Sequence, residues 1–191
     1  ASVQEPFEKF VEELLFRIHE DDPEIALLPK EAIFRIYRDV RFSKNKEPYK
    51  IFASAIMSPN GRGNIEEPGY YIELGAEEVR FYGGNYMIGT ENLYKTRKHI
   101  AENLDEFNSI INDKKFIKMF GNILGEKHKR IPSEFKEASE KQPLLFNKQL
   151  YHFASFKPSI LTTPTLIDKM MDCYFTAKPF YKFINEGITI K

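Results

Sequence analysis

The most basic part of this sequence lies between Pro29 and Lys50. Seven lysines and arginines accompany three acidic residues there, whereas the whole chain has 28 Lys and Arg against 28 Asp and Glu. An arginine side chain presents forked N–H donors that bind phosphate and carboxylate groups bidentately. This local excess of positive charge therefore indicates the binding of a small anion. The seven basic residues are Lys30, Arg35, Arg38, Arg41, Lys44, Lys46 and Lys50.

Alternation of side chains within this stretch predicts a β-strand over residues 32–42. On that strand Arg38 would interrupt an apolar face made by its neighbours Phe34, Ile36, Val40 and Phe42. A buried guanidinium is costly unless it is paired, so we expect Arg38 to meet a carboxylate, carbonyl oxygens or a bound anion. The opposite face would carry Arg35, Tyr37, Asp39 and Arg41.

Three more side chains extend this candidate site. Asp39 lies between arginines and could orient one guanidinium. Tyr49 could donate a hydrogen bond to the anion or act as a weak general acid. Arg97 interrupts an apolar helical stripe and would add a cation if that helix covers the sheet. The candidate ligand-binding residues are Arg35, Arg38, Asp39, Arg41, Lys46, Tyr49, Lys50 and Arg97.

The same residues allow two other interpretations. In the first, the Arg and Asp side chains form a buried ion network in a structural or protein-interaction module. In the second, aromatic residues interleaved with the basic ones bind nucleic acid weakly by stacking. A nucleic-acid partner is the least favoured, because no module signature is present and the aromatic residues fit the core equally well. The interleaved aromatic residues are Phe34, Tyr37, Phe42 and Tyr49.

Other catalytic and metal-binding patterns are missing from the sequence. It has no G-x-S-x-G, H-E-x-x-H, G-x-x-x-x-G-K-[ST] or C-x-x-C motif. Its four histidines are scattered singly, and we expect each to be structural or exposed to solvent. We predict no metal site and no cofactor, and we make no prediction of enzymatic activity. The histidines are His19, His99, His128 and His152.

The first half of the chain supplies the elements that must position these residues. Apolar spacing predicts a helix from Pro6 to about Ile18. Residues 32–42 and 50–57 are expected to pair as an antiparallel hairpin. A second hairpin is predicted over 70–74 and 78–82, closed by Gly83 and Gly84.

The second half of the chain is predicted to be mainly helical. A helical region over 93–120 should break near Asp113, and short strands are expected over 123–131 and 150–156. A final helix should begin at Thr163-Pro164 with Phe175 among its inward residues, and Pro179 should break or kink it. This order favours an α+β fold whose sheet is mainly antiparallel and built from hairpins.

Length and composition favour one soluble domain over residues 1–191. No apolar run is long enough to span a membrane and no signal-like segment opens the chain, so we expect no membrane partner. The single Cys173 favours a reducing, cytoplasmic compartment. The oligomeric state is not predicted.

The basic stretch also resembles the signature of a known family. Its pattern matches the family named domain of unknown function 2461, a group of conserved hypothetical proteins. The similarity extends through Arg97 and Lys129-Arg130-Ile131-Pro132 towards the C-terminus. It implies a fold and a candidate site, and it supplies no activity, cofactor or catalytic residue. The matching residues are Arg35, Arg38, Asp39, Arg41, Phe42, Asn45, Lys46 and Tyr49.

Two departures from the family pattern stand out. Asn85 follows Gly83 and Gly84 where the family pattern has a third glycine. Family members usually begin with a further helical segment that carries Trp, and this chain contains no Trp. We therefore expect that segment to be missing here and its absence to leave an exposed apolar patch.

Overall fold

The computed structural model describes residues 4–36 and 50–189. Five of the eight candidate site residues lie outside the described residues, and so does the expected pairing of Arg38. These five are Arg38, Asp39, Arg41, Lys46 and Tyr49.

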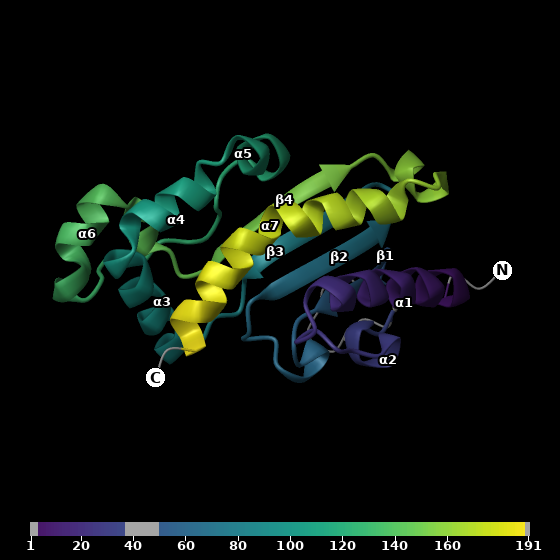
Figure 1. Cartoon of the computed structure of the whole chain (residues 1–191), viewed down its shortest axis with the longest axis horizontal. Helices are drawn as coiled ribbons and strands as arrows, with labels where there is room; N and C mark the ends of the chain where they lie inside the picture. Colours follow the sequence, from purple (N-terminus) through teal and green to yellow (C-terminus); the bar gives the residue numbers. More distant parts are fainter. Residues whose placement is uncertain (1–3, 37–49, 190–191) are drawn as a thin grey trace, which may run out of the picture. The chain divides into compact units, whose positions relative to one another are not determined.

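The described part of the chain contains seven α-helices and a four-stranded antiparallel sheet, which confirms the predicted α+β class (Figure 1). The α-helices are α1 (Gln4–Asp21), α2 (Pro29–Ala32), α3 (Thr90–Glu102), α4 (Leu104–Ile111), α5 (Lys114–Phe120), α6 (Lys136–Lys141) and α7 (Leu166–Thr189). The strands are β1 (Phe52–Met57), β2 (Gly69–Gly75), β3 (Val79–Asn85) and β4 (Leu150–Phe156). Short 3-10 helices are η1 (Gly61–Gly63), η2 (Ser133–Phe135), η3 (Pro143–Phe146) and η4 (Pro158–Thr162).

The strands are ordered β1-β2-β3-β4 in the sheet. β1 pairs antiparallel with β2, with Phe52 opposite Gly75 and Met57 opposite Tyr70. A tight turn joins β2 to β3, where the Gly75 N–H donates to the Glu78 carbonyl at 3.0 Å. The second predicted hairpin is therefore confirmed. Gly83 and Gly84 do not close it, because both lie within β3.

Contacts group the chain into two compact units. Unit 1 comprises Ala1–Asn64, Tyr70–Phe81 and Ser155–Asp172. Unit 2 comprises Ile65–Gly69, Tyr82–Ala154 and Cys173–Lys191. Strands β2, β3 and β4 and helix α7 contribute residues to both units. The expectation of a single domain stays a prediction.

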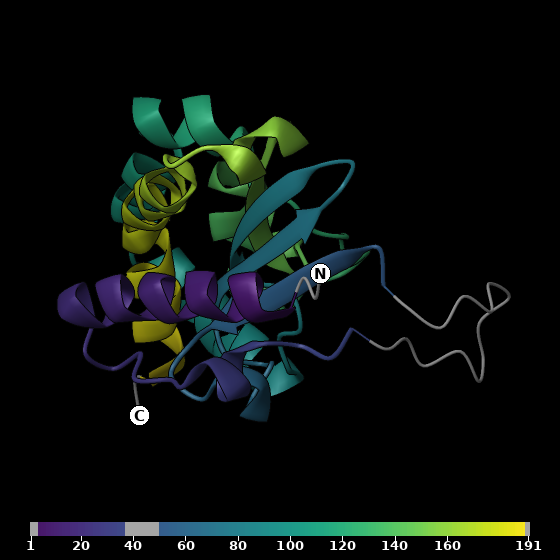
Figure 2. The ribbon, with the colours of Figure 1, turned by 90° about the vertical axis from the view of Figure 1, so that its right-hand side faces the viewer.

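In unit 1, α1 and α2 lie next to β1 (Figures 1 and 2). The apolar stripe predicted for the first helix is confirmed, because its buried residues follow the helical period. Ala32 does not begin a strand as predicted but ends α2. Pro29 favours that helical turn at its first position, and the Glu31 carboxylate accepts the Leu28 N–H at 2.8 Å.

The segment after α2 pairs with the start of β1. Ile33 forms an antiparallel bridge with Ala55, and the Phe34 N–H donates to the Ser54 carbonyl at 2.9 Å. The Lys50 N–H donates to the Ile36 carbonyl at 2.8 Å. The described residues of the first predicted hairpin, 33–36 and 50–57, thus pair antiparallel, but 33–36 form an isolated bridge and no regular strand.

In unit 2, helices α3 to α6 follow one another as short elements. The predicted break near Asp113 is confirmed, since its carboxylate caps α5 by accepting the N–H groups of Lys115 and Phe116. The strand predicted over 123–131 is wrong, because Leu124 and Lys127 form only isolated bridges. Gly125 has a φ of +155°, a conformation that interrupts regular strand pairing there.

Helix α7 differs from its prediction in three respects. It begins at Leu166 rather than at Thr163-Pro164, and it continues without a break through Pro179 to Thr189. Its Phe175 side chain is 48% exposed, so this residue does not point inward. Phe180, Phe183 and other residues beyond the proline are buried, and this packing offsets the hydrogen bond that proline cannot donate.

Candidate anion-binding site

The described residues place three of the eight predicted site residues. Arg35 and Lys50 belong to unit 1, in segments whose backbones are joined by the hydrogen bond from the Lys50 N–H to the Ile36 carbonyl, and Arg97 belongs to unit 2. Arg35 is exposed, Lys50 is half-buried and Arg97 is buried. These three side chains therefore have different surroundings.

Arg35 lines a pocket of about 350 Å³ in unit 1, which we call the basic pocket. Its cations are Arg35, Lys30 of α2 and Arg62 of η1, and its acidic residue is Glu8 of α1. Apolar side chains, among them Phe7, Ile33 and Phe34, also line the pocket. The pocket is lined by Gln4, Phe7, Glu8, Lys30, Ile33, Phe34, Arg35, Ile36, Ala53 and Arg62.

The Arg62 guanidinium connects η1 to α2 beside this pocket. Its Nε donates to the Glu31 carbonyl at 3.3 Å, and its Nη2 donates to the Lys30 carbonyl. Gly61 permits the close approach of the two elements, because a Cβ there would lie 2.8 Å from the Glu31 oxygen at a φ of +51°. The local turn therefore fixes the backbone from which Lys30 projects.

Lys30 and Arg35 are the cations of the pocket that are available to a ligand. Within residues 4–36 and 50–189, no carboxylate lies within ion-pair distance of either side chain. Arg17, by contrast, contacts Asp168 at 2.9 Å. Three cations against Glu8 leave the basic pocket with a net positive charge.

Lys50 contacts aromatic rings near this pocket without lining it. Its Nζ lies 5.5 Å from the Phe34 ring centroid and 5.8 Å from that of Phe52. The Phe34 ring also packs edge-on against Tyr71, with 5.7 Å between centroids. Lys50 thus packs on Phe34, an aromatic residue that lines the basic pocket.

Arg97 is buried on α3, in the apolar stripe in which the sequence places it, and its predicted role as an additional cation of the anion site stays a prediction. Its Nε donates to the Leu145 carbonyl at 2.8 Å and its Nη2 to the Asn147 carbonyl at 3.2 Å. Burial lowers the pKa of Arg97, although a guanidinium stays charged at neutral pH. These contacts tie α3 to the segment around η3 within unit 2.

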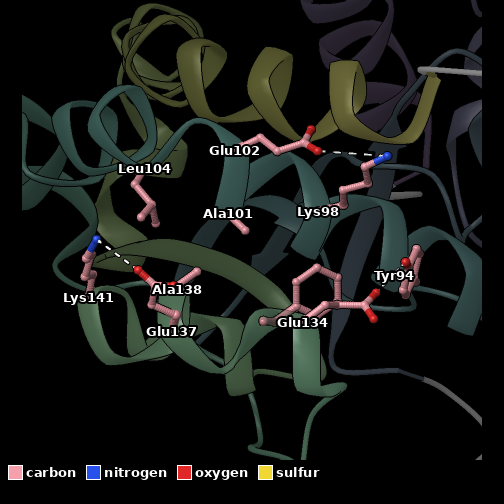
Figure 3. Close-up of a pocket in the computed structure, with 10 residues that line it drawn as sticks. Tyr94, Lys98, Ala101, Glu102, Leu104, Glu134, Glu137, Ala138 and Lys141 are labelled. Carbon is pink, nitrogen blue, oxygen red and sulfur yellow. Dashed lines mark hydrogen bonds and ion pairs between the residues drawn. The ribbon is translucent and has the colours of Figure 1, made fainter.

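Unit 2 contains another pocket, of about 400 Å³, between α3 and α6 (Figure 3). The Lys98 Nζ lies 3.9 Å from the Glu102 Oε1, and the Lys141 Nζ lies 3.9 Å from the Glu137 Oε1. The Tyr94 hydroxyl donates to the Glu134 carboxylate, which raises the pKa of Tyr94. Because its charged groups have partners within the pocket, this site is less suited than the basic pocket to binding an anion.

His152 of β4 was expected to be structural or exposed, and it is fully buried. Its ring centroid lies 4.2 Å from the ring centroid of Phe120, 4.8 Å from that of Phe116 and 5.4 Å from that of Phe180. Neither ring nitrogen has a hydrogen-bond partner among the described residues. Burial lowers the pKa of His152 to about 3, so the ring is neutral at physiological pH. Its burial follows from alternation with Leu150 and Ala154, a signal that the sequence does contain.

No group of three or more His, Cys, Asp or Glu residues in residues 4–36 and 50–189 could hold a metal ion. None of the helices in the part of the chain that the structure describes is long and apolar enough to cross a membrane.

The fold and pocket define an α+β protein with a basic pocket beside the hairpin that carries the arginine-rich stretch. The chain belongs to the family of conserved hypothetical proteins called DUF2461, whose model matches residues 1–183. Comparisons with curated proteins and with solved structures found no match.

Proposed function

We propose that this protein binds a small ligand bearing a phosphate or carboxylate group at the basic pocket of unit 1. The observation that carries the proposal is the pair of cations Lys30 and Arg35, which face the pocket without a carboxylate partner among the described residues. Arg35 is also exposed, which favours ligand binding over a buried ion network at this position.

The chemistry of the pocket suits recognition of a polyatomic anion. The Arg35 guanidinium would form parallel hydrogen bonds with two oxygens of the ligand, and Lys30 would add a point charge. Arg62 is held by backbone carbonyls and would strengthen the positive field. Arg38, Asp39, Arg41, Lys46, Tyr49 and Lys50 remain part of the proposal on sequence grounds alone.

A thermal-shift scan tests this proposal. The protein is heated with phosphate, sulfate, nucleotides, sugar phosphates or dicarboxylates at constant ionic strength, because a general salt effect would otherwise imitate binding. A ligand at 100 times its Kd stabilises the native state by about 2.7 kcal/mol. We expect at least one of these anions to raise the melting temperature.

Variants identify the residues responsible for the shift. Arg35→Ala and Lys30→Ala should each remove most of it. Arg130→Ala is the matched control, because Arg130 is an exposed arginine of unit 2 and should leave the shift unchanged. The proposal is wrong if no anion raises the melting temperature, or if the shift persists in both pocket variants. A shift produced only by oligonucleotides would favour the nucleic-acid interpretation.

A further inference from the structure

A second pocket of unit 1 adjoins the basic one. It has a volume of about 450 Å³ and lies among α1, β1, β2, η4 and the first turn of α7. Phe10, Leu74, Leu161 and Ile167 line it, and none of its lining residues is charged. We call it the apolar pocket.

The two pockets share a boundary. Phe7 of α1 and Ala53 of β1 line both of them. Phe7 is only 7% exposed, so its ring is fixed by packing at this boundary. The basic pocket and the apolar pocket are therefore adjacent within unit 1.

We infer that the anion bound at the basic pocket is amphiphilic, with a hydrocarbon or aromatic part in the apolar pocket. The inference rests on the proposed function, because Lys30 and Arg35 supply the charge recognition. Cations at one end and uncharged residues at the other complement the head and the tail of such a molecule. Both pocket volumes lie within the range of about 300–1,000 Å³ that is usual for small-molecule sites.

Chain length is the property that tests this inference. The probes are straight-chain carboxylates from acetate to octanoate, together with the matching alkyl phosphates, titrated calorimetrically below their micelle concentrations at constant ionic strength. Each buried methylene should lower the Kd about fourfold until the apolar pocket is filled. Comparing the two series shows which head group the cations prefer.

Two variants separate the two ends of the site. Leu161 is 37% exposed, so Leu161→Gln should reduce the gain per methylene while leaving acetate affinity unchanged. Ile117→Gln is the matched control, because Ile117 is a 47% exposed apolar residue in unit 2. Arg35→Gln should weaken every member of a series by a similar factor.

The outcomes test the amphiphilic ligand separately from the proposed anion binding. Arg35-dependent binding that does not change with chain length would overturn the amphiphilic ligand and leave the proposed function standing. Absence of binding by every acid and phosphate would contradict both. Octanol binding as tightly as octanoate would also overturn the inference, because the apolar pocket would then act without the cations.

Discussion

Arg97 shows how this protein accommodates a buried guanidinium. The carbonyl oxygens of Leu145 and Asn147 accept its hydrogen bonds, and no carboxylate among the described residues pairs with it. A buried cation without acceptors would be strongly destabilising. The two carbonyls therefore make Arg97 a link between α3 and the segment around η3.

Arg97→Ala should lower the free energy of unfolding by about 1 to 3 kcal/mol, because two carbonyls would lose their partner. Lys98→Ala is the neighbouring control, since Lys98 makes only a 3.9 Å ion pair at the surface. Urea denaturation of both variants measures the difference. Equal free energies of unfolding in the two variants would show that the carbonyl contacts of Arg97 do not stabilise the fold.

His152 introduces a pH dependence of stability with a definite sign. Its pKa is about 3 in the folded state against an ordinary value of 6.5. Well above pH 6.5 the ring is neutral in both states, so His152 contributes no pH dependence to the stability there. As the pH falls from 6.5 towards 3, the unfolded state binds a proton that the folded state excludes, so stability is lost through that range.

We therefore expect wild-type protein to lose about 1.4 kcal/mol more stability than His152→Leu between about pH 7.5 and about pH 5.5. Leucine keeps the volume and apolar contacts of the ring without a titratable group. Urea denaturation of both proteins at the two pH values gives this difference, from which other titrating groups cancel. Parallel changes in the two proteins would contradict the burial of His152.

At the residue scale the sequence could place Arg97 on an apolar helix face, but it could not predict the basic pocket. Arg97 lies on one helix whose period alone places it among apolar neighbours. The pocket combines Glu8, Lys30, Arg35 and Arg62, which come from four separate segments. Their proximity depends on tertiary packing and on the turn at Gly61, which a local pattern does not contain.

At the element scale, α7 shows how packing overrides a local signal. Pro179 cannot donate a backbone hydrogen bond to the carbonyl of Phe175, and a proline costs about 3 kcal/mol in a helix interior. The helix nevertheless continues, because Phe180, Tyr181, Phe183 and Ile184 are buried. Their apolar burial outweighs the local cost of the proline.

Pro179→Ala should consequently stabilise the protein by about 1 to 2 kcal/mol, less than the full helix cost because alanine leaves the unfolded chain more freedom. The Pro179 side chain is exposed, so its removal leaves no cavity. Thermal and urea denaturation measure the change. A loss of stability would mean that the proline ring makes contacts that stabilise the folded protein.

Elements with a strong period were predicted well, and those set by special backbone geometry were not. The stripe of α1 and the alternation of β2 and β3 each indicate one structure. Gly83 and Gly84 suggested a turn, but small residues are needed there for packing inside β3. A Cβ on Gly83 would lie 2.6 Å from the His152 ring, and this long-range contact has no local signature.

At the scale of the whole molecule, Arg35 belongs both to the sequence pattern that resembles the family signature and to the basic pocket. Arg35 is the first residue of the pattern by which the sequence resembles the family, and the basic pocket places Lys30 and Arg62 beside it. The proposed function depends on the sign of the charge at this point. It can therefore be tested by lowering the positive charge of the pocket and by raising it.

Calorimetric titration of inorganic phosphate into three proteins makes this test. Arg35→Gln should raise the phosphate Kd at least about tenfold, because it removes charge-assisted hydrogen bonds of about 1.5 kcal/mol or more. Glu8→Gln should lower the Kd below that of wild type, because it removes the acidic residue that lines the pocket. Equal affinities in all three proteins, or no saturable binding to wild type, would contradict anion binding at the basic pocket.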